Sequence, residues 1–480
     1  MSTRRVVVQA PDERGLRQVT IDGAAAGSAW SPRDLRRQLR RAGLPGDMDL
    51  EDRAAVSWRG ADSATWPDRT GRRRATIALM AAGLLVSAAL LADVGMVDAL
   101  GALTFSGRLT GSLFVLSGAV QAVSAALVFD FWGKRTLRYS GPMVMVGVLI
   151  AVATEGLLLA VWFQESEWTP YLPVFLALSL WSLWAVWAIW RERAWKGITH
   201  PKSFTASVVA TALLAAANFS YSALYQPQAA LFHFKVEAKF GTPTRDPELP
   251  LVYLPVKLHV ANDGAVSGYV LNSAYWVEGR ESVFDGKKAE PDRKEWRADA
   301  EAGVDTELYV QPTGYRTINS GLALPVDAWI APGTDFTKEL VVQIPTDARY
   351  DIVTAKMTAI FLREDRGRID ARLQSPVYSW QQKTERFFDC SPAPFADYVI
   401  YHARVWNNNN IINVTRRPRY VSSSRWPGKQ GSVIDSRISP LDSRGRVSAD
   451  AESAERYGVD QYVSAVTAIP FASLLDLKRS

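Results

Sequence analysis

Apolar residues divide the chain into two kinds of sequence. Between residues 75 and 225, long apolar runs contain few charges, whereas the segments on both sides are rich in Arg, Asp, Glu and Lys. A helix needs roughly 20 predominantly apolar residues to cross about 30 Å of hydrocarbon. Five stretches meet this requirement, so we expect a five-helix transmembrane domain over 71–225, with spans at 75–95, 109–131, 142–163, 171–190 and 204–225.

The charges between these runs predict their orientation. Basic residues gather before the first run, between the second and third, and between the fourth and fifth, whereas the alternate connections carry Asp98 with one arginine, or Glu165 and Glu167 with none. Cytoplasmic loops carry the excess of Lys and Arg. We therefore expect a multi-pass protein of the cell membrane with a cytoplasmic N-terminus and an extracytoplasmic segment after residue 225. Because the first apolar run begins only after residue 74, it should remain as a signal anchor.

Tryptophan recurs at every third position in the stretch LWSLWAVWAIWRERAW, residues 180–195, which ends in a pair of arginines. Amphipathic rings favour the membrane–water interface, but Trp181 lies about 13 Å deeper than Trp190 by the helical rise. For the deeper rings we expect lipid-facing and interhelical packing, with an aromatic cage for a cationic or quinone-like ligand as the alternative. The predicted interface anchors are Trp132, Trp190, Trp195, Arg72, Arg73, Arg74, Arg191 and Arg193.

One acidic residue, Glu155, lies deep within a predicted span. Gln121 of the second span and Asn218 of the fifth fall within about 5 Å of the same depth by the helical rise. Such groups either hydrogen-bond across helices, at about 1 kcal/mol per contact, or form a proton or cation site around the acid. No Arg, Lys or His shares the layer, which favours the first interpretation.

The N-terminal residues 1–70 predict a small cytoplasmic module with the order ββαβ. RRVVVQA and LRQVTID are typical of two strands, SPRDLRRQLRRAG of a helix that begins at Ser31 and Pro32, and AAVSWRG of a third strand. This order is similar to a β-grasp. The helical arginines at 36, 37, 40 and 41 either touch anionic lipid or form a solvated face.

After residue 225 the apolar period changes from helical to alternating. In LVYLPVKLHVANDG, residues 251–264, Val, Leu, Val, Leu and Val alternate with polar positions before a turn, and SGYVLNSAYWVEG follows as the expected hairpin partner. Two later stretches, 329–345 and 350–365, alternate in the same way. This pattern predicts an antiparallel β-sandwich over 226–385, with a charged loop at 279–307.

LHVANDG and the later PGTDFTKELVVQIP resemble the extracytoplasmic immunoglobulin-like sandwiches of bacterial surface proteins, here of a polytopic membrane protein. The resemblance covers roughly residues 231–365 and implies an Ig-like fold with a binding role. Abundant Ala, Arg and Val with sparse Lys is typical of a high-GC bacterium. The remaining residues 386–480 predict a β-rich or irregular extension, with an irregular surface segment at 424–446 and a closing helix at 458–477.

The sequence shows no motif for catalysis. HExxH, GxSxG, Walker and Rossmann patterns are missing, and the four histidines are scattered. The single cysteine, Cys390, excludes an intrachain disulfide and a multi-cysteine metal site. The net charge of +6 comes largely from arginine beside the apolar runs, which indicates membrane orientation and not nucleic-acid binding. We expect no metal and no cofactor.

These features predict a multi-domain α and β membrane protein without enzymatic activity. It would present an extracytoplasmic binding or assembly domain as a scaffold, sensor or envelope-complex subunit, with the bilayer, an extracytoplasmic protein and a second copy of the chain as candidate partners. The alternative is a transporter, channel or intramembrane enzyme that uses Glu155, Gln121 and Asn218.

Overall fold

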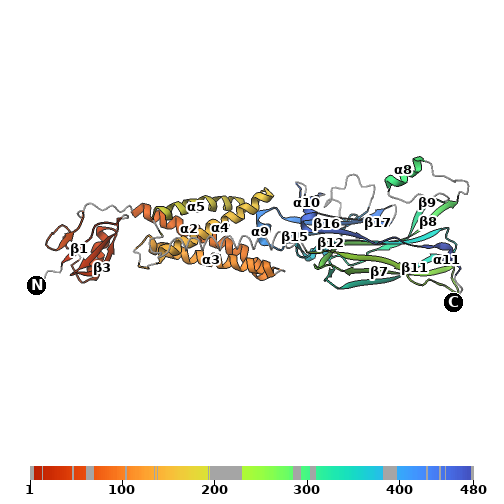
Figure 1. The fold of residues 1–480 in the computed structure, drawn as a ribbon, viewed down its shortest axis with the longest axis horizontal. Coiled ribbons are helices and arrows are strands. Elements are labelled where there is room, and N and C mark those ends of the chain that lie inside the picture. The colour runs from red at the N-terminus through yellow and green to blue at the C-terminus, as the bar shows by residue number, and fades with distance from the viewer. Residues whose placement is uncertain are drawn as a thin grey trace. The chain divides into compact units, whose positions relative to one another are not determined.

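The computed structural model of the 480-residue chain divides into two compact units. The first comprises Met1–Met96, Gly111–Phe163 and Pro170–Ala217, and the second comprises Val97–Thr110, Gln164–Thr169 and Asn218–Ser480. The elements of both are drawn in Figure 1. The structure describes residues 5–12, 15–45, 48–60, 70–102, 105–133, 136–137, 139–192, 194, 230–284, 293–302, 310–381, 397–428, 431–442, 445–448 and 450–476.

The first unit begins with a four-stranded sheet and one helix. Its sheet has the order β3-β2-β1-β4, in which β1 is antiparallel to β2 and parallel to β4. Helix α1 begins after Ser31, whose side chain accepts a hydrogen bond from the backbone N–H of Asp34 at 3.2 Å, as the sequence predicts. The elements are β1 (Val6–Val8), β2 (Arg17–Ile21), β3 (Ala24–Ala29), α1 (Pro32–Arg41) and β4 (Val56–Trp58).

The observed order is βββαβ, so the expected order ββαβ lacks one strand. The additional strand, β3, has the sequence AAAGSA, and its first four residues are exposed. Because it lies at the edge of the sheet and buries little apolar surface, it lacks the alternation that marks a strand in sequence.

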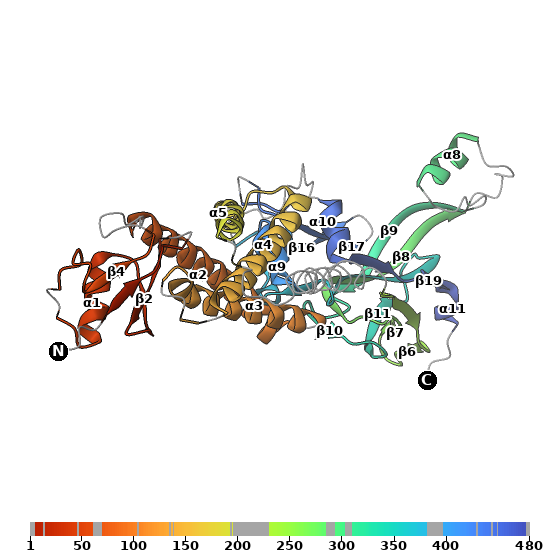
Figure 2. The ribbon, with the colours of Figure 1, turned by 60° about the vertical axis from the view of Figure 1, so that its left-hand side comes forward.

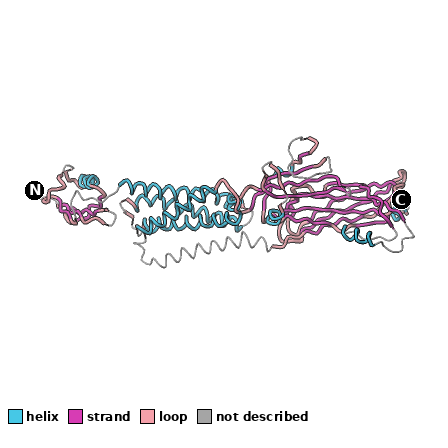
Figure 3. Tube along the Cα trace, turned by 90° about the horizontal axis from the view of Figure 1, so that it is seen from above, coloured by secondary structure: helices cyan, strands magenta, loops and turns pink. Residues whose placement is uncertain are grey.

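Four long apolar helices follow, and each covers one of the expected spans. They are α2 (Thr70–Gly101), α3 (Phe105–Phe131), α4 (Ser140–Glu165) and α5 (Leu172–Arg191). Figure 3 shows them as cyan coils that run alongside one another. All four are long and apolar enough to cross a membrane, which fits a membrane-embedded protein. The expected fifth span, 204–225, lies outside the described residues.

Small residues let these helices approach closely. A Cβ atom added at Gly118 of α3 would lie 2.9 Å from the Ala88 carbonyl oxygen of α2, and one added at Gly147 of α4 would lie 2.5 Å from the side chain of Ser124. The Ser124 hydroxyl also donates to the Met143 carbonyl of α4 at 2.8 Å. Small residues and interhelical hydrogen bonds of this kind hold helices together in lipid, where the hydrophobic effect between helices is weak.

The tryptophans of α5 differ in burial along the helix. Trp181 is 9% exposed, packs against Gly83 of α2 and donates its indole N–H to the Leu79 carbonyl at 3.0 Å. Trp187 and Trp190, nearer the arginine end, are 48% and 68% exposed. The deepest ring thus serves interhelical packing, one of the two roles expected for it.

The second unit is built from three layers of mainly antiparallel β-sheet. One sheet has the order β11-β7-β5, the next has β10-β8-β12-β18 with β9 and β19 alongside, and the last has β13-β15-β16-β17 with β14 alongside. The strands are β5 (Phe234–Phe240), β6 (Thr244–Arg245), β7 (Leu251–Asn262), β8 (Gly268–Phe284), β9 (Val310–Gly321), β10 (Trp329–Ile330), β11 (Asp335–Pro345), β12 (Ile352–Arg363), β13 (Gly367–Ile369), β14 (Val377–Tyr378), β15 (Val399–Asn407), β16 (Arg419–Gly428), β17 (Gly431–Ser439), β18 (Val459–Val463) and β19 (Thr467–Pro470).

Short helices complete this unit: α8 (Arg293–Ala302), α9 (Asn410–Thr415), α10 (Ala451–Tyr457), α11 (Phe471–Leu475) and the 3₁₀ helix η2 (Ala371–Gln374). Figure 2 shows β8 and β9 extending as a curved ribbon toward α8. The charged segment expected as a loop at 279–307 therefore contains the end of β8 and the helix α8.

The middle sheet has an apolar core on each of its faces. Along β12, Val353, Ala355, Met357, Ala359 and Phe361 all enter the core shared with the β11-β7-β5 sheet, as the alternation predicts. A β-bulge lies between Ile360 and Phe361. Ile360 and Leu362 enter the second core, where they meet Val421 of β16 and Ile438 of β17. Because both faces are buried, β12 ends in a continuous apolar run, as buried strands do.

Three local expectations for this unit are wrong. Strand β8 does not pair with β7 across the NDG turn; it pairs with β12 in the next layer. The segment expected to be irregular at 424–446 forms most of the β16–β17 hairpin, and the expected closing helix is instead β18, β19 and the five-residue α11. Apart from these three, strands on the two sides of residue 385 pair with each other, since β14 pairs with β15 and β18 with β12.

We predict that Gly83→Ala destabilises the helices of the first unit by about 1–3 kcal/mol, because a Cβ atom there would overlap the Trp181 ring. This loss would occur although alanine is the better helix former. Gly156→Ala is the matched control, since no described atom lies within 4 Å of its added Cβ. Thermal unfolding in detergent measures both variants. Equal stability of the two would contradict the tight α2–α5 contact.

Candidate functional site

Among the described residues of the first unit, a hydrogen bond between two polar side chains lies deep in the apolar helices. The Ser87 hydroxyl of α2 donates to the Glu155 carboxylate of α4 at 2.8 Å. Ser87 is 0% and Glu155 is 1% exposed, so the pair is enclosed by protein. An acid in such a place is costly unless it is neutral or hydrogen-bonded, and the serine supplies one hydrogen bond.

Gln121 of α3, the second predicted member of the polar layer, is also buried. One turn on either side of it, Gly118 contacts Ala88 of α2 and Ser124 contacts Gly147 of α4. Gln121 is 0% exposed, and neither its amide N–H₂ nor its carbonyl oxygen has a hydrogen-bond partner among the described residues; the same is true of Glu155 Oε2. Asn218, the third predicted member of the layer, lies outside the described residues.

The predicted interface anchors occupy varied positions. Arg72 and Arg74 are exposed, and the Arg191 guanidinium lies 5.4 Å from the centre of the Trp187 ring. Arg73 lies 4.0 Å over Trp30, and Trp132 is only 4% exposed. Trp195 and Arg193 lie outside the described residues. The anchoring role itself stays a prediction.

A second polar cluster lies in the second unit, where two connections between the apolar helices meet the sheet β13-β15-β16-β17. Asp98 of the segment Val97–Thr110 is 4% exposed, and its two carboxylate oxygens accept the backbone N–H of Asn410 at 3.0 and 2.9 Å. Asn410 is the first residue of α9, whose preceding residue, Asn409, caps the same helix. A carboxylate at this position satisfies amide groups that a helix leaves without partners.

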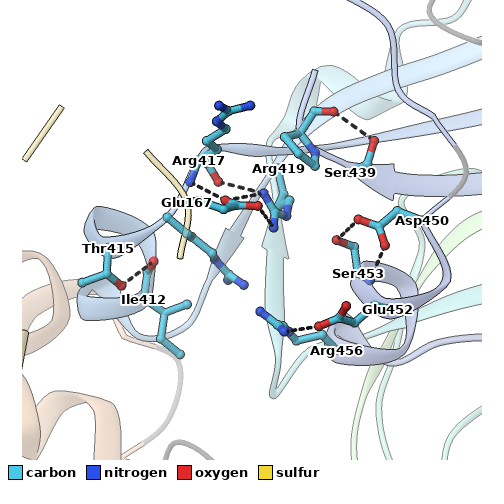
Figure 4. Close-up of polar contacts among 12 residues, drawn as sticks. Glu167, Ile412, Thr415, Arg417, Arg419, Ser439, Asp450, Glu452, Ser453 and Arg456 are labelled. Atoms are coloured by element: carbon cyan, nitrogen blue, oxygen red, sulfur yellow. Dashed lines mark hydrogen bonds and ion pairs between the residues drawn. The ribbon is translucent and has the colours of Figure 1, made fainter. Parts of the chain in front are cut away.

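Glu167, of the segment Gln164–Thr169, makes the strongest contact of this cluster (Figure 4). Arg419 donates from two guanidinium nitrogens to its two carboxylate oxygens at 3.0 and 2.8 Å, and the Arg417 backbone N–H donates at 3.0 Å. Burial by itself would raise the pKa of Glu167, but the hydrogen bonds from Arg419 and Arg417 outweigh it and lower this pKa below its ordinary value. The bidentate geometry is the one that arginine and carboxylate prefer.

Thr169, two residues further on, is 0% exposed and donates to the Val414 carbonyl at 3.0 Å. We call the contacts of Asp98, Glu167 and Thr169 with residues 410–419 the polar seam. The seam joins residues 245 to 312 positions apart in the chain. It therefore fixes two short connections, each next to an apolar helix in sequence, to the strands and helix of the third sheet.

A small pocket lies beside the seam, with a cavity volume of about 240 Å³. Its lining includes Asp98, Arg368, Trp406 and four asparagines between 407 and 413. Two of these asparagines already hydrogen-bond to each other. The Asn407 backbone N–H donates to Asn413 Oδ1, and Asn413 Nδ2 donates to the Asn407 carbonyl. These bonds shape the turn into α9, so the pocket follows from the packing of the seam.

The polar seam could not be predicted from the sequence. Asp98 and Glu167 entered the prediction only as loop charges, and no role was predicted for the four consecutive asparagines at 407–410. The one available signal was that both connections without a basic cluster carry acids, while Arg416, Arg417 and Arg419 follow the asparagines at close spacing. Opposite charges so far apart in the sequence are compatible with many pairings, so this signal does not identify the pairs that form.

Among the described residues, no group of three or more His, Cys, Asp or Glu side chains is arranged to hold a metal. His402 has a pKa lowered to about 4 by burial, so its ring is neutral at physiological pH. His259 lies on the polar face of β7, 3.1 Å from the Thr337 hydroxyl.

Comparison with protein families and with curated proteins finds no match. Parts of the chain are similar to two solved structures. One is the putative ApaA protein from Bordetella pertussis, at 19% identity over 28% of this chain and 81% of that one, with a TM-score of 0.16. The other is the sporulation control protein Spo0M from Bacillus subtilis, at 10% identity over 51% and 92% of the two chains, with a TM-score of 0.17. These low TM-scores carry no conclusion about fold or function.

We predict that Glu167→Gln lowers the free energy of local opening around Arg419 by about 1–2 kcal/mol, because it leaves a guanidinium that is 6% exposed without its charged partner. Since the pKa of Glu167 is lowered on folding, its contribution is complete above the unfolded value of about 4.3 and is lost as the pH falls through the folded value. Amide hydrogen exchange of β16 at pH 7 and at acid pH measures both effects.

The control for this variant is Glu452→Gln. Glu452 pairs with Arg456 at 2.7 Å, but its side chain is 80% exposed, so the change should cost less than about 0.5 kcal/mol. If exchange in β16 responds equally to the two substitutions, or if the effect of Glu167→Gln does not diminish in acid, the seam does not hold this edge of the sheet.

Proposed function

We propose that this chain is a non-enzymatic protein of the bacterial cell membrane that presents its second unit as an extracytoplasmic binding or assembly domain. It would act as a scaffold, a sensor or a subunit of an envelope complex. The small module at residues 1–70 would lie in the cytoplasm. The partner would be an extracytoplasmic protein or envelope component, and a second copy of the chain is an alternative partner.

The polar seam is the observation that carries this proposal. Val97–Thr110 and Gln164–Thr169 belong to the same compact unit as the β-sheets, so the sheets share the side of the membrane on which these connections lie. These are the two connections that lack a basic cluster, and the positive-inside rule assigns them to the outside. This support is independent of where the fifth span begins or ends.

The same argument bears on the number of crossings. If Gln164–Thr169 is outside, α5 runs inward to Arg191, which carries the basic end of the helix. The chain must then cross once more before β5 starts at Phe234. The apolar stretch 204–225 is the sequence that meets this need, as expected from its length and composition.

The second unit offers surfaces that a partner could use. The ribbon of β8 and β9 leaves Phe284 75% exposed, and Trp296 of α8 is 54% exposed. Exposed aromatic side chains are over-represented where proteins meet other proteins. The edge strands β11 and β17 also carry backbone groups that an added strand can pair with.

We predict that an impermeant thiol reagent labels Glu339→Cys in intact cells, and that it labels Ala25→Cys and Leu137→Cys only after permeabilisation, all in a Cys390→Ser background. Each of the three positions is exposed in the structure, so access depends on the membrane and not on burial. The reverse pattern would put the β-sheets in the cytoplasm and end the proposal of an extracytoplasmic binding domain.

The second candidate function is a transporter, channel or intramembrane enzyme. It is favoured by the enclosed Ser87–Glu155 contact and by the buried Gln121 of α3. A carboxyl group in this setting is a standard site for proton or cation passage.

For this candidate we predict that Glu155→Gln abolishes a proton or cation flux in proteoliposomes while the folded protein persists. A purely structural Glu155 predicts a different result. Glu155→Gln would then leave flux unchanged, and Glu155→Leu would lower thermal stability by about 1 kcal/mol through the lost hydrogen bond. Ser87→Ala provides the matched control, since it removes the same bond from the other side and leaves the carboxyl group in place.

A further inference from the structure

Helix α1 of the first unit has two faces of opposite character. Leu35, Gln38 and Leu39 are buried against the small sheet. Five arginines occupy the opposite arc of the helix, and all are exposed: Arg33, Arg36, Arg37, Arg40 and Arg41. With 3.6 residues per turn, these positions fall on one continuous stripe of the helix surface. We call this stripe the α1 basic face.

The guanidinium groups of this face have no protein partner among the described residues, either as hydrogen bonds or as ion pairs. The one acid of the helix, Asp34, is directed to its N-terminus, where it accepts from the Trp30 backbone N–H at 3.4 Å. Arginines elsewhere in the chain are commonly paired, as in Arg280–Asp351 at 2.6 Å. Within the described part of the chain, the α1 basic face is therefore a concentration of positive charge without paired acids.

From this we propose that the α1 basic face binds the anionic surface of the cytoplasmic membrane leaflet. The inference rests on the proposed orientation, in which the N-terminal module is cytoplasmic. Anionic lipids give that leaflet a negative surface potential, which attracts clusters of basic residues close to the membrane. Guanidinium groups match lipid phosphates well, because their planar donors form paired hydrogen bonds to phosphate oxygens.

The covalent connection favours a membrane over a soluble acidic partner. Only ten residues separate Gly60 from Gly71, where the first candidate span begins, and ten residues span at most about 35 Å. The module therefore remains close to the bilayer, at a high effective concentration relative to its surface. Trp30, which directly precedes the cap of α1, also donates its indole N–H to the Gly133 carbonyl at 3.1 Å, just beyond α3. A soluble polyanion has no such advantage.

The test is energy transfer between the module and the bilayer in the full-length protein. A donor dye on Ala25→Cys, in a Cys390→Ser background, would report to an acceptor on lipid headgroups in nanodiscs of neutral lipid or of neutral lipid with phosphatidylglycerol. We expect transfer to rise with phosphatidylglycerol and this rise to vanish at high salt, since salt screens exposed charges. Nanodiscs present both faces of the membrane, so the result does not depend on orientation in cells.

Charge variants make the test specific. Arg36→Gln, Arg37→Gln and Arg40→Gln together should abolish the rise with phosphatidylglycerol. Arg5→Gln, Arg53→Gln and Arg59→Gln remove the same number of exposed charges from other parts of the module and should keep it. Transfer that ignores lipid charge, or that both triple variants change equally, would overturn the proposal. If transfer does not follow lipid charge and the module instead binds added nucleic acid or an acidic protein through these arginines, the face belongs to a soluble partner.

Failure of this inference and failure of the proposed function give different results. An inverted labelling pattern in cells, together with transfer that still follows lipid charge, would remove the proposed orientation and leave the lipid-binding face. The expected labelling pattern without an effect of lipid charge on transfer would remove the lipid-binding face and leave the proposed orientation.

Discussion

The contact between Glu167 and Arg419 joins a connection between two apolar helices to the third sheet of the second unit. It joins two residues 252 positions apart, and both side chains are largely covered, at 6% exposure for the arginine and 25% for the glutamate. Taking either charge out of water alone would be costly, but two donors facing two acceptors offset that cost. Asp98 and Thr169 make further contacts of this kind. As a result, two short connections between apolar helices belong to the same compact unit as the β-sheets.

This arrangement constrains the possible functions more than any single motif does. The sheets do not hang from one flexible linker after residue 225, since two earlier connections also belong to their compact unit. The intramembrane contact of Ser87 with Glu155 lies in the first unit and uses none of the residues of the seam. The two polar clusters can therefore be altered separately.

The sequence predicted the elements that depend on local pattern. Four of the five apolar runs are long helices, and the alternation of Val252, Leu254, Val256, Leu258 and Val260 is matched by burial of all five side chains. It failed where the outcome depends on distant partners. A turn after Asn262 is consistent with a hairpin, but β8 joins β12 in another layer. Leu271 of β8 and Ile360 of β12 lie in a second core with residues of β15, β16 and β17, which follow much later in the chain. The strand β3 was missed because it buries almost nothing.

The polar seam and the α1 basic face show the same residue type under two physical conditions. In the second unit, Arg280, Arg363 and Arg419 each meet an acid within 2.9 Å, and their side chains are at most 12% exposed. Burial there demands a partner, because an unpaired guanidinium would forfeit its hydration without compensation. On α1 the arginines stay in water, so hydration satisfies them and no partner within the chain is required. Their charge is therefore available to an external surface, whereas the charge of Arg419 in the seam is already paired with Glu167 inside the protein.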